Sequence, residues 1–313
     1  MSDARAAGGG GDRGARTAAK WDALPVVGKG FALVGVGIVI LSPDALLIRL
    51  MTFDEATLLF FRGAIAVVGY LALIRLHRGA VGARRTWTLT RSELAIAALM
   101  VLANVLFVTS IRNVNAALAL VIITSAPAFT AVLSRLVGET IAPRTWIAAW
   151  VVLGGVGAIF VTAPAGGGDL PGTLAAVGAS ITLAVTLTVR RRSPEARMLP
   201  SLAVGAALTA LVALPFASPL SASAENLEWA LISGLIVLPV SLDLIWRAPR
   251  YITAPEVSLV SLMEAVLGPL WIWLALGEAP TLAVVLCGAV IIGTLATHAV
   301  LTQRELDSTR SIS

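Results

Sequence analysis

Charged side chains that interrupt long apolar runs are the residues of this chain best suited to do chemistry. Asp44 follows Ser42-Pro43 inside the first run, and Arg49 and Arg62 lie at a similar depth. We expect Pro43 to kink the first helix and to free backbone carbonyls for a ligand or water. A charge at bilayer depth is expensive, so Asp44 needs a reason to be there. It either braces helices as a fixed Asp–Arg pair or forms a substrate-binding or proton-linked site.

Glu264 is the second acidic residue at depth, about ten residues into the apolar run 256–275. At 1.5 Å per residue it lies roughly 15 Å along the helix, near the middle of a bilayer. No basic residue lies within one turn of it in sequence. An uncompensated carboxyl at this depth could exchange protons near neutral pH. The alternative is a protonated glutamic acid that hydrogen-bonds to a neighbouring helix.

Further polar and aromatic residues inside the runs are weaker candidates. Asp243 has Arg247 one helical turn later, which is the spacing of an ion pair, so a brace or snorkelling competes with a role in the site. Asn104, Ser125 and Asp243 are expected as polar lining of a cavity. Three aromatic residues either line such a pocket or simply pack: Trp246, Tyr251 and Trp271.

The elements that must position these residues are ten apolar runs. The chain is 58% hydrophobic and 13% charged, whereas soluble domains carry about 25% charged residues. A run of about 20 apolar residues spans a bilayer as a helix, so we predict an all-α integral membrane protein with ten transmembrane helices. The runs cover residues 30–50, 57–75, 93–111, 116–136, 146–163, 172–189, 201–217, 229–247, 256–275 and 282–301.

The basic residues give these runs an orientation. With the N-terminus in the cytoplasm, all but three of the 23 Lys and Arg residues fall on the cytoplasmic side, and the exceptions are Arg49, Arg62 and Arg112. This is the positive-inside pattern, which predicts that both termini are cytoplasmic. We expect the basic patches to contact anionic lipid headgroups and not nucleic acid.

The chain divides into two halves of five runs. We predict a disordered cytoplasmic tail over 1–28, a first repeat over 29–163, an extracytoplasmic linker over 164–171, a second repeat over 172–302 and a cytoplasmic tail over 303–313. Gly138-Glu139 and Gly277-Glu278 follow the fourth and ninth runs at an offset of 139 residues. Because each half has an odd number of spans, the halves enter the membrane from opposite sides, which predicts inverted repeats.

Several motifs that define other classes of protein are missing from the sequence. It has no phosphate-binding loop and only two lysines, which argues against an ATP-driven pump. One cysteine and two histidines give no usual metal site, and no catalytic Ser or zinc-protease motif appears. We therefore predict no cofactor, no metal and no enzymatic activity.

Three short helix-start motifs also appear. Thr52-x-x-Glu55, Thr90-x-x-Glu93 and Thr253-x-x-Glu256 fit the capping box, in which both residues cap the first turn of a helix. We interpret their three glutamates as structural.

These features together resemble the drug/metabolite transporter (DMT) superfamily, in its ten-helix EamA-type branch. The similar segments are Ser42-Pro43-Asp44, Phe61-Arg62-Gly63 and the stretch from Arg250 through Gly277-Glu278, and the resemblance covers about residues 29–302. This chain departs from the family at Ala265, where relatives often have a proline after the residue matching Glu264. In the first half, Pro127 lies at the comparable depth.

The resemblance implies a proton- or gradient-driven carrier, often an exporter of amino acids and other small metabolites. It also implies a central cavity lined by helices 1, 3, 4, 6, 8 and 9, with helices 5 and 10 at the periphery. We expect a secondary active transporter in the bacterial inner membrane, as a monomer or weak homodimer. The alternative function is a membrane-embedded enzyme, or a lipid-handling or scaffold protein that does not transport.

Overall fold

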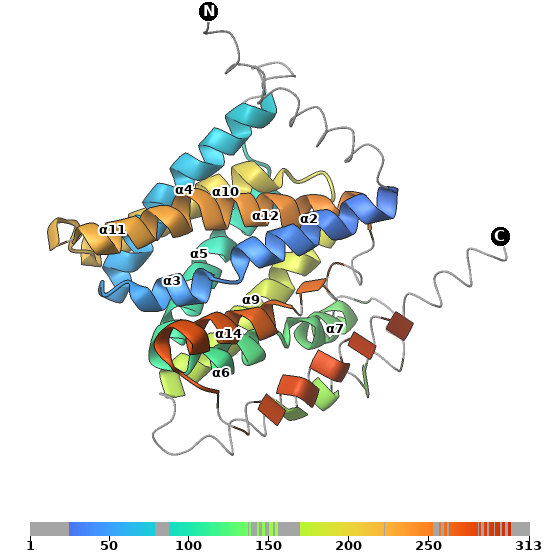
Figure 1. The fold of residues 1–313 in the computed structure, drawn as a ribbon. Helices are drawn as coiled ribbons and strands as arrows, with labels where there is room; N and C mark the ends of the chain where they lie inside the picture. Colours follow the sequence, from blue (N-terminus) through green and yellow to red (C-terminus); the bar gives the residue numbers. More distant parts are fainter. Residues whose placement is uncertain are drawn as a thin grey trace, which may run out of the picture.

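The helices of this protein form one packed bundle in the parts of the chain that the structure describes (Figure 1). The structure is a computed structural model, which describes residues 25–78, 88–136, 170–221, 223–252 and 263–280, with scattered residues in 138–155, 257–261 and 282–301. The helices before residue 137 are α2 (Val26–Leu41), α3 (Asp44–Leu50), α4 (Glu55–Arg78), α5 (Arg91–Asn113), α6 (Ala116–Ile123) and α7 (Ala126–Leu136). The later ones are α9 (Leu170–Arg192), α10 (Met198–Ala213), η1 (Leu214–Phe216), η2 (Pro219–Ser221), α11 (Ala224–Leu231), η3 (Ile232–Val237), α12 (Leu238–Arg247), η4 (Ala248–Arg250) and α14 (Glu264–Leu276).

Seven segments of the described chain are long and apolar enough to cross a membrane. They correspond to the first four predicted runs and to the sixth, seventh and eighth. The ninth run is represented by the shorter apolar helix α14. The fifth and tenth runs lie mostly outside the described residues. The all-helical membrane fold is therefore supported, and the total of ten spans stays a prediction.

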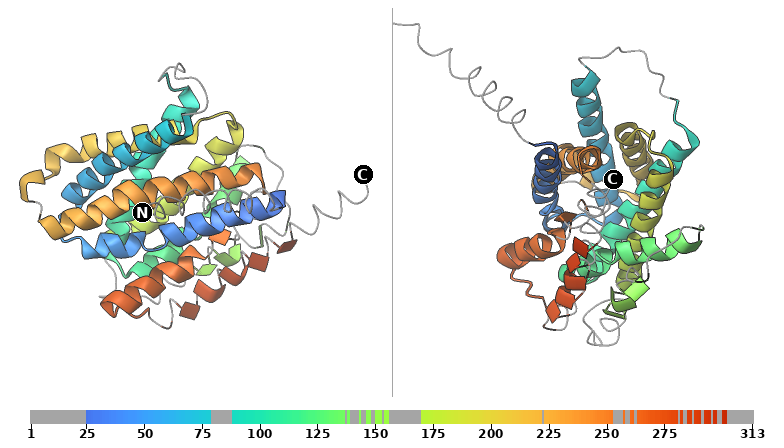
Figure 2. Two further views of the ribbon diagram at one scale, coloured as in Figure 1. Left: turned by 45° about the horizontal axis from the view of Figure 1, so that its top comes forward. Right: turned by 90° about the vertical axis from the view of Figure 1, so that its right-hand side faces the viewer.

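Pairs of helices from the two halves pack along their lengths. In both views of Figure 2, α2 lies beside α12, and α5 packs against α9 and α10. Helix α4 packs between α10 and the π-helix η3, and α14 packs on α6 and α3. The largest apolar cluster joins α3, α4, α5 and α6, with Ile48, Leu58 and Ile111 fully buried. The first-half helices thus pack mainly on second-half helices.

Helix α4 approaches its neighbours closely because it presents glycines. A Cβ atom added at Gly63 would lie 2.7 Å from the Ala206 carbonyl oxygen and 2.8 Å from the Ala210 nitrogen of α10. A Cβ atom at Gly69 would lie 2.9 Å from the Leu235 carbonyl oxygen of η3. Small residues of this kind let helix backbones touch inside a membrane, where apolar area alone does not favour association.

Helix α5 begins with the predicted capping box. Thr90 accepts from the Glu93 amide, and the Glu93 carboxylate accepts from the Thr90 amide. Glu93 also accepts from the Arg197 side chain at 2.7 Å, and this hydrogen bond raises the pKa of Arg197. Glu93 therefore caps α5 and also joins its start to the loop between α9 and α10.

The capping box predicted at Thr52-x-x-Glu55 is wrong. Asp54, not Thr52, precedes α4 and accepts from the Thr57 amide at 2.9 Å, and hydrogen bonds from Thr57 lower the pKa of Asp54. Glu55 turns instead to Asn113 of α5. The Thr52 amide donates to the side chain of Asn226 in α11. The third predicted box, at 253–256, lies outside the described residues.

Candidate functional site

The first span breaks where the sequence predicts a kink. Helix α2 ends at Leu41, a turn occupies Ser42-Pro43, and α3 starts at Asp44. Because Pro43 has no amide hydrogen, the Val39 carbonyl loses its helical partner, and the Ser42 hydroxyl replaces it at 2.9 Å. The break therefore places Asp44 in the first turn of a new helix, where the helix dipole favours a negative charge.

Asp44 forms a two-pronged ion pair with Arg62 of α4. Arg62 Nη1 donates to Asp44 Oδ1 at 2.6 Å, and Arg62 Nη2 donates to Asp44 Oδ2 at 2.5 Å. Each residue is only 3% exposed. Burying either charge alone would cost several kcal/mol, so the bidentate contact keeps the pair neutral inside the bundle. Sequence alone left the choice between Arg49 and Arg62 open, and the structure selects Arg62.

A serine that sequence analysis did not select completes this group. Ser233 is fully buried, accepts from Arg62 Nη1 at 2.8 Å and donates to Asp44 Oδ1 at 3.0 Å. It lies in the π-helix η3, and such wide turns occur frequently at functional sites. The pair Ser233-Gly234 inside an apolar run was the available signal, but serine alone is common in membrane helices. We term Asp44, Arg62 and Ser233 the charge cluster.

Glu264 approaches the charge cluster from another helix. It is the first residue of α14 and is partly buried, and α14 packs on α3, the helix that begins with Asp44. Among the described residues, none donates a hydrogen bond to it or forms an ion pair with it. One helix turn later, a Cβ atom added at Gly268 would lie 3.8 Å from the Ser42 carbonyl oxygen, at the break of the first span. The carboxyl groups of Glu264 and Asp44 thus lie at the starts of two helices that pack on each other.

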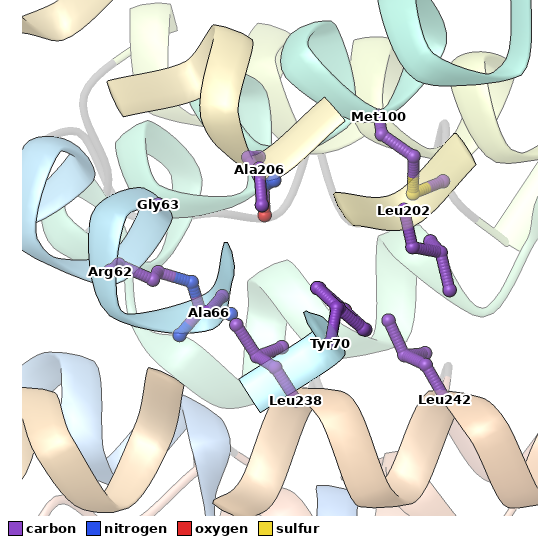
Figure 3. Close-up of a pocket in the computed structure, with 10 residues that line it drawn as sticks. Arg62, Gly63, Ala66, Tyr70, Met100, Leu202, Ala206, Leu238 and Leu242 are labelled. Atoms are coloured by element: carbon purple, nitrogen blue, oxygen red, sulfur yellow. The ribbon is translucent and has the colours of Figure 1, made fainter. Parts of the chain in front are cut away.

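A small cavity adjoins the charge cluster on its other side. It lies between α4, α5, α10 and α12, and it is lined by Arg62, Gly63, Ala66, Tyr70, Met100, Asn104, Leu202, Ala206, Leu238 and Leu242. Figure 3 shows apolar side chains of α12 and α10 facing Tyr70 across it. The cavity offers about 30 Å³, room for about two waters.

Two polar groups at this cavity have spare hydrogen-bonding capacity. The Arg62 Nε atom is buried without a hydrogen-bond partner in the described structure. The Asn104 amide nitrogen reaches Thr209 only at 3.5 Å, the outer limit of a hydrogen bond. Asn104 therefore lines the same small cavity as Arg62, and its role in binding stays a prediction.

The remaining predicted site residues divide between bracing and packing. Ser125 is buried and hydrogen-bonded to Ser180 of α9 at 3.1 Å. Asp243 pairs with Arg247 at 2.7 Å, one turn along α12. Trp246 and Tyr251 pack against apolar clusters. These contacts favour structural roles for all four residues.

Trp271 is the predicted aromatic residue that reaches the site. Its indole Nε1 donates to the Ser42 hydroxyl at 2.9 Å. Because Ser42 in turn donates to the Val39 carbonyl, the break in the first span is held by a residue of α14. Trp271 of the ninth span therefore stabilises the helix break that precedes Asp44.

The cavity differs in one respect from the one the family resemblance implied. Helices 1, 3, 4, 6, 8 and 9 were expected to line it, but α4 and α10, the second and seventh spans, contribute six of its ten lining residues. The reason is the close contact at Gly63, which brings α4 and α10 together at the centre of the bundle.

An all-helical bundle with seven described spans and buried charges defines a multi-pass membrane protein. Residues 28–161 match the EamA-like transporter family, which is consistent with the drug/metabolite transporter superfamily. This match confirms the resemblance seen in the sequence for the first half of the chain.

Solved structures support the fold. Among 27 matching chains, one described only as "Crystal structure of protein" aligns with a TM-score of 0.63 over 88% of this chain and 98% of its own. The two are 19% identical, so this likeness concerns the fold alone. No curated protein matches the sequence.

Proposed function

We propose that this protein is a secondary active transporter that exports amino acids or similar small metabolites by alternating access, coupled to protons. The observation that carries the proposal is the buried charge cluster beside a small cavity, in a chain whose residues 28–161 match a transporter family. Buried ionisable residues within membrane spans typically mark substrate or proton pathways. The proposed location is the bacterial inner membrane with both termini in the cytoplasm.

The proposed architecture is ten spans in two inverted repeats, over 29–163 and 172–302. Helix packing supports it: exchanging each span for its counterpart converts the α5–α9 contact into the α12–α2 contact. The same exchange converts α5–α10 into α12–α4 and leaves α4–α10 as its own counterpart. A two-fold relation between the halves would produce this pattern.

Matching helix breaks also support the repeat. The fourth span breaks at Thr124-Ser125, between α6 and α7, and the ninth has a turn at Met263, immediately before α14. Gly138 and Gly277, which are 139 residues apart, both adopt left-handed backbone conformations after these spans, at φ of 87° and 71°. Discontinuous helices at corresponding positions of two halves are typical of transporter substrate sites.

The proposed transport step is an exchange of partners on Arg62. The cavity holds about two waters, whereas ligand pockets usually have several hundred Å³. The structure therefore corresponds to a state in which the pathway is closed around the cluster. When α4 and α12 separate, a substrate carboxylate replaces Asp44 on the Arg62 guanidinium, and a proton on Asp44 or Glu264 keeps the site neutral.

Flux measurements with purified protein in liposomes test the proposal. A panel of labelled amino acids and related metabolites is assayed for counterflow, with an imposed pH gradient in each direction and with empty liposomes as control. The proposal expects saturable counterflow of at least one compound and a rate that changes when the gradient is reversed. Absence of flux across the panel, together with chemical conversion of a compound, would instead favour a membrane-embedded enzyme.

A further inference from the structure

Three arginines are exceptions to the charge asymmetry of the sequence, and all three bind other groups of the protein. The pattern predicts Arg49, Arg62 and Arg112 on the side away from the termini, termed here the outer face. Arg62 belongs to the charge cluster. Arg49 and Arg112 lie apart from that cluster, at the ends of α3 and α5. Their position against the usual charge bias calls for a separate reason.

Arg49 and Arg112 bind each other's backbone segment. Arg112 donates from α5 to the carbonyl oxygens of Met51 at 2.7 Å and Phe53 at 2.8 Å, which follow α3. Arg49 donates from α3 to the Val114 carbonyl oxygen at 2.5 Å, which follows α5. Each guanidinium thus binds carbonyls of the segment that follows the other arginine's helix. We term this reciprocal contact the outer clamp.

Two more contacts extend the outer clamp to other helices. Arg49 Nη1 lies 3.5 Å from Glu278, which follows α14, so the ninth span joins the first. Glu55 at the start of α4 accepts from Asn113 at 2.7 Å and from Thr109 at 3.1 Å, both on α5. The outer ends of the first, second, third and ninth spans are therefore tied together by polar contacts.

The opposite face has a different arrangement at the corresponding positions. Positions 188 and 251, which lie 139 residues after Arg49 and Arg112, fall beside Arg190 and Arg250. These two guanidiniums repel each other. Arg190 donates to the Ser193 and Pro194 carbonyls of its own loop. Where the outer ends are clamped to each other, Arg190 at the equivalent inner end binds carbonyls of its own loop.

We propose that the outer clamp is the outer gate of the transport pathway, closed in this structure and released when the pathway opens outward. The inference rests on the proposed function. Its mechanical link is α3: Arg49 lies five residues after Asp44 on this helix, about 7.5 Å along it. Release of Arg49 from Val114 frees the end of the helix that holds Asp44 against Arg62, so gate and charge cluster move together.

Thiol labelling tests the gate without any substrate. Cys287 is replaced by serine, and Ala45→Cys places a thiol beside Asp44 at a position only 3% exposed. A membrane-impermeant thiol reagent is added to the outer side of oriented vesicles. Arg112→Ala should raise the labelling rate at least tenfold. Arg91→Ala, which removes an exposed arginine from the other end of α5, should leave it unchanged.

Two results would overturn the gate. One is an Arg112→Ala variant that labels at the parent rate, and the other is an equal rise with Arg91→Ala, which would indicate general loosening. If Arg112→Ala does not fold, Arg49→Ala replaces it with the same expectation, because it removes the other half of the outer clamp.

Cross-linking gives the opposite test. Glu55→Cys and Asn113→Cys are bridged by a short, reducible bifunctional thiol reagent, which should stop flux until the bridge is reduced. Flux that persists across the closed bridge contradicts the gate. If no compound is transported at all, the proposed function fails, and the labelling rates alone decide whether the outer clamp opens.

Discussion

The Asp44–Arg62 pair is chemically asymmetric, because its two charges cannot be lost equally easily. A carboxylate left alone in an apolar bundle can take up a proton, but a guanidinium stays protonated at any accessible pH. The two residues are equally buried and share Ser233, so their environments do not offset this difference. The cost of removing one partner should therefore depend on which partner remains.

We predict that Asp44→Ala destabilises the protein more than Arg62→Ala. Breaking a buried pair costs about 3–5 kcal/mol when an uncompensated charge remains, and only the first variant leaves one that cannot neutralise. Thermal unfolding in detergent measures the difference. Asp243→Ala is the matched control, since its partner Arg247 is 32% exposed at the side chain and should tolerate the loss. Equal unfolding temperatures for the two cluster variants would contradict the argument.

Glu264 leads to a second prediction at this scale. Because no described residue donates to its carboxyl, Glu264→Gln should fold with wild-type stability. The glutamine amide cannot bind and release a proton as a carboxyl group does, so flux should lose its dependence on the pH gradient. Flux is measured in liposomes with the gradient imposed and then collapsed. A variant that responds to the gradient like the wild type would remove Glu264 from the coupling mechanism.

Sequence reasoning reached most of this site because charge at bilayer depth is rare. Asp44, Arg62 and Glu264 stand out in any apolar run, and the structure brings Asp44 and Arg62 into contact. Ser233 could not be found in the same way, because a hydroxyl in a membrane helix often satisfies a local carbonyl. Only the packing of η3 on α4 reveals that it faces two charges.

At the scale of elements, the contact between α4 and α10 depends on the absence of a side chain at Gly63. Its nearest neighbours there are backbone atoms of Ala206 and Ala210, which cannot rotate away as a flexible side chain would. The same contact forms one wall of the cavity. The spacing of these two helices therefore determines both the stability of the bundle and the width of the site.

We predict that Gly63→Ala destabilises the protein by about 1–3 kcal/mol, because overpacking forces the two backbones apart. Gly35→Ala in α2 is the matched control, since an added Cβ there meets no atom within 4 Å. That change should be neutral or stabilise by up to about 1 kcal/mol through helix propensity. Unfolding free energies in detergent compare the two, and a similar cost at both positions would show that the close contact is unimportant.

The predicted helix starts show where local patterns are sufficient. Thr90-x-x-Glu93 forms its capping box because the chain before α5 leaves both groups free to turn back. Thr52-x-x-Glu55 has the same spacing but does not form one. Asp54 is nearer to the first turn, and Glu55 and Thr52 are taken by α5 and Asn226. Tertiary partners override the motif, and the sequence alone does not reveal them.

At the scale of the whole molecule, the two faces of the bundle carry different charge patterns. The described outer-face arginines bind backbone carbonyls and Glu278, whereas Arg190 and Arg250 repel each other on the opposite face. The asymmetry of basic residues was readable from the sequence, because it is a property of composition along the chain. The reciprocal clamp was not, since it joins Arg49 to Val114 across 65 residues.

The predicted orientation can be tested by labelling single cysteines. In a Cys287→Ser background, Leu220→Cys should react with an impermeant reagent from outside the cell, and Glu195→Cys only after the membrane is opened. Both positions are exposed, in the loops that follow the seventh and sixth spans. If each cysteine reacts from the opposite side, the orientation of the protein in the membrane is the reverse of the predicted one. The outer clamp would then lie on the cytoplasmic side.

The central claim is that the buried charge cluster exchanges partners during transport. Its most direct test compares pH-gradient-driven flux in liposomes for wild type, Asp44→Asn and Asp243→Asn. Both variants remove the carboxylate charge of a buried aspartate that pairs with an arginine. The account predicts that Asp44→Asn loses at least nine-tenths of the flux while Asp243→Asn keeps most of it. Undiminished, gradient-dependent flux with Asp44→Asn would contradict it.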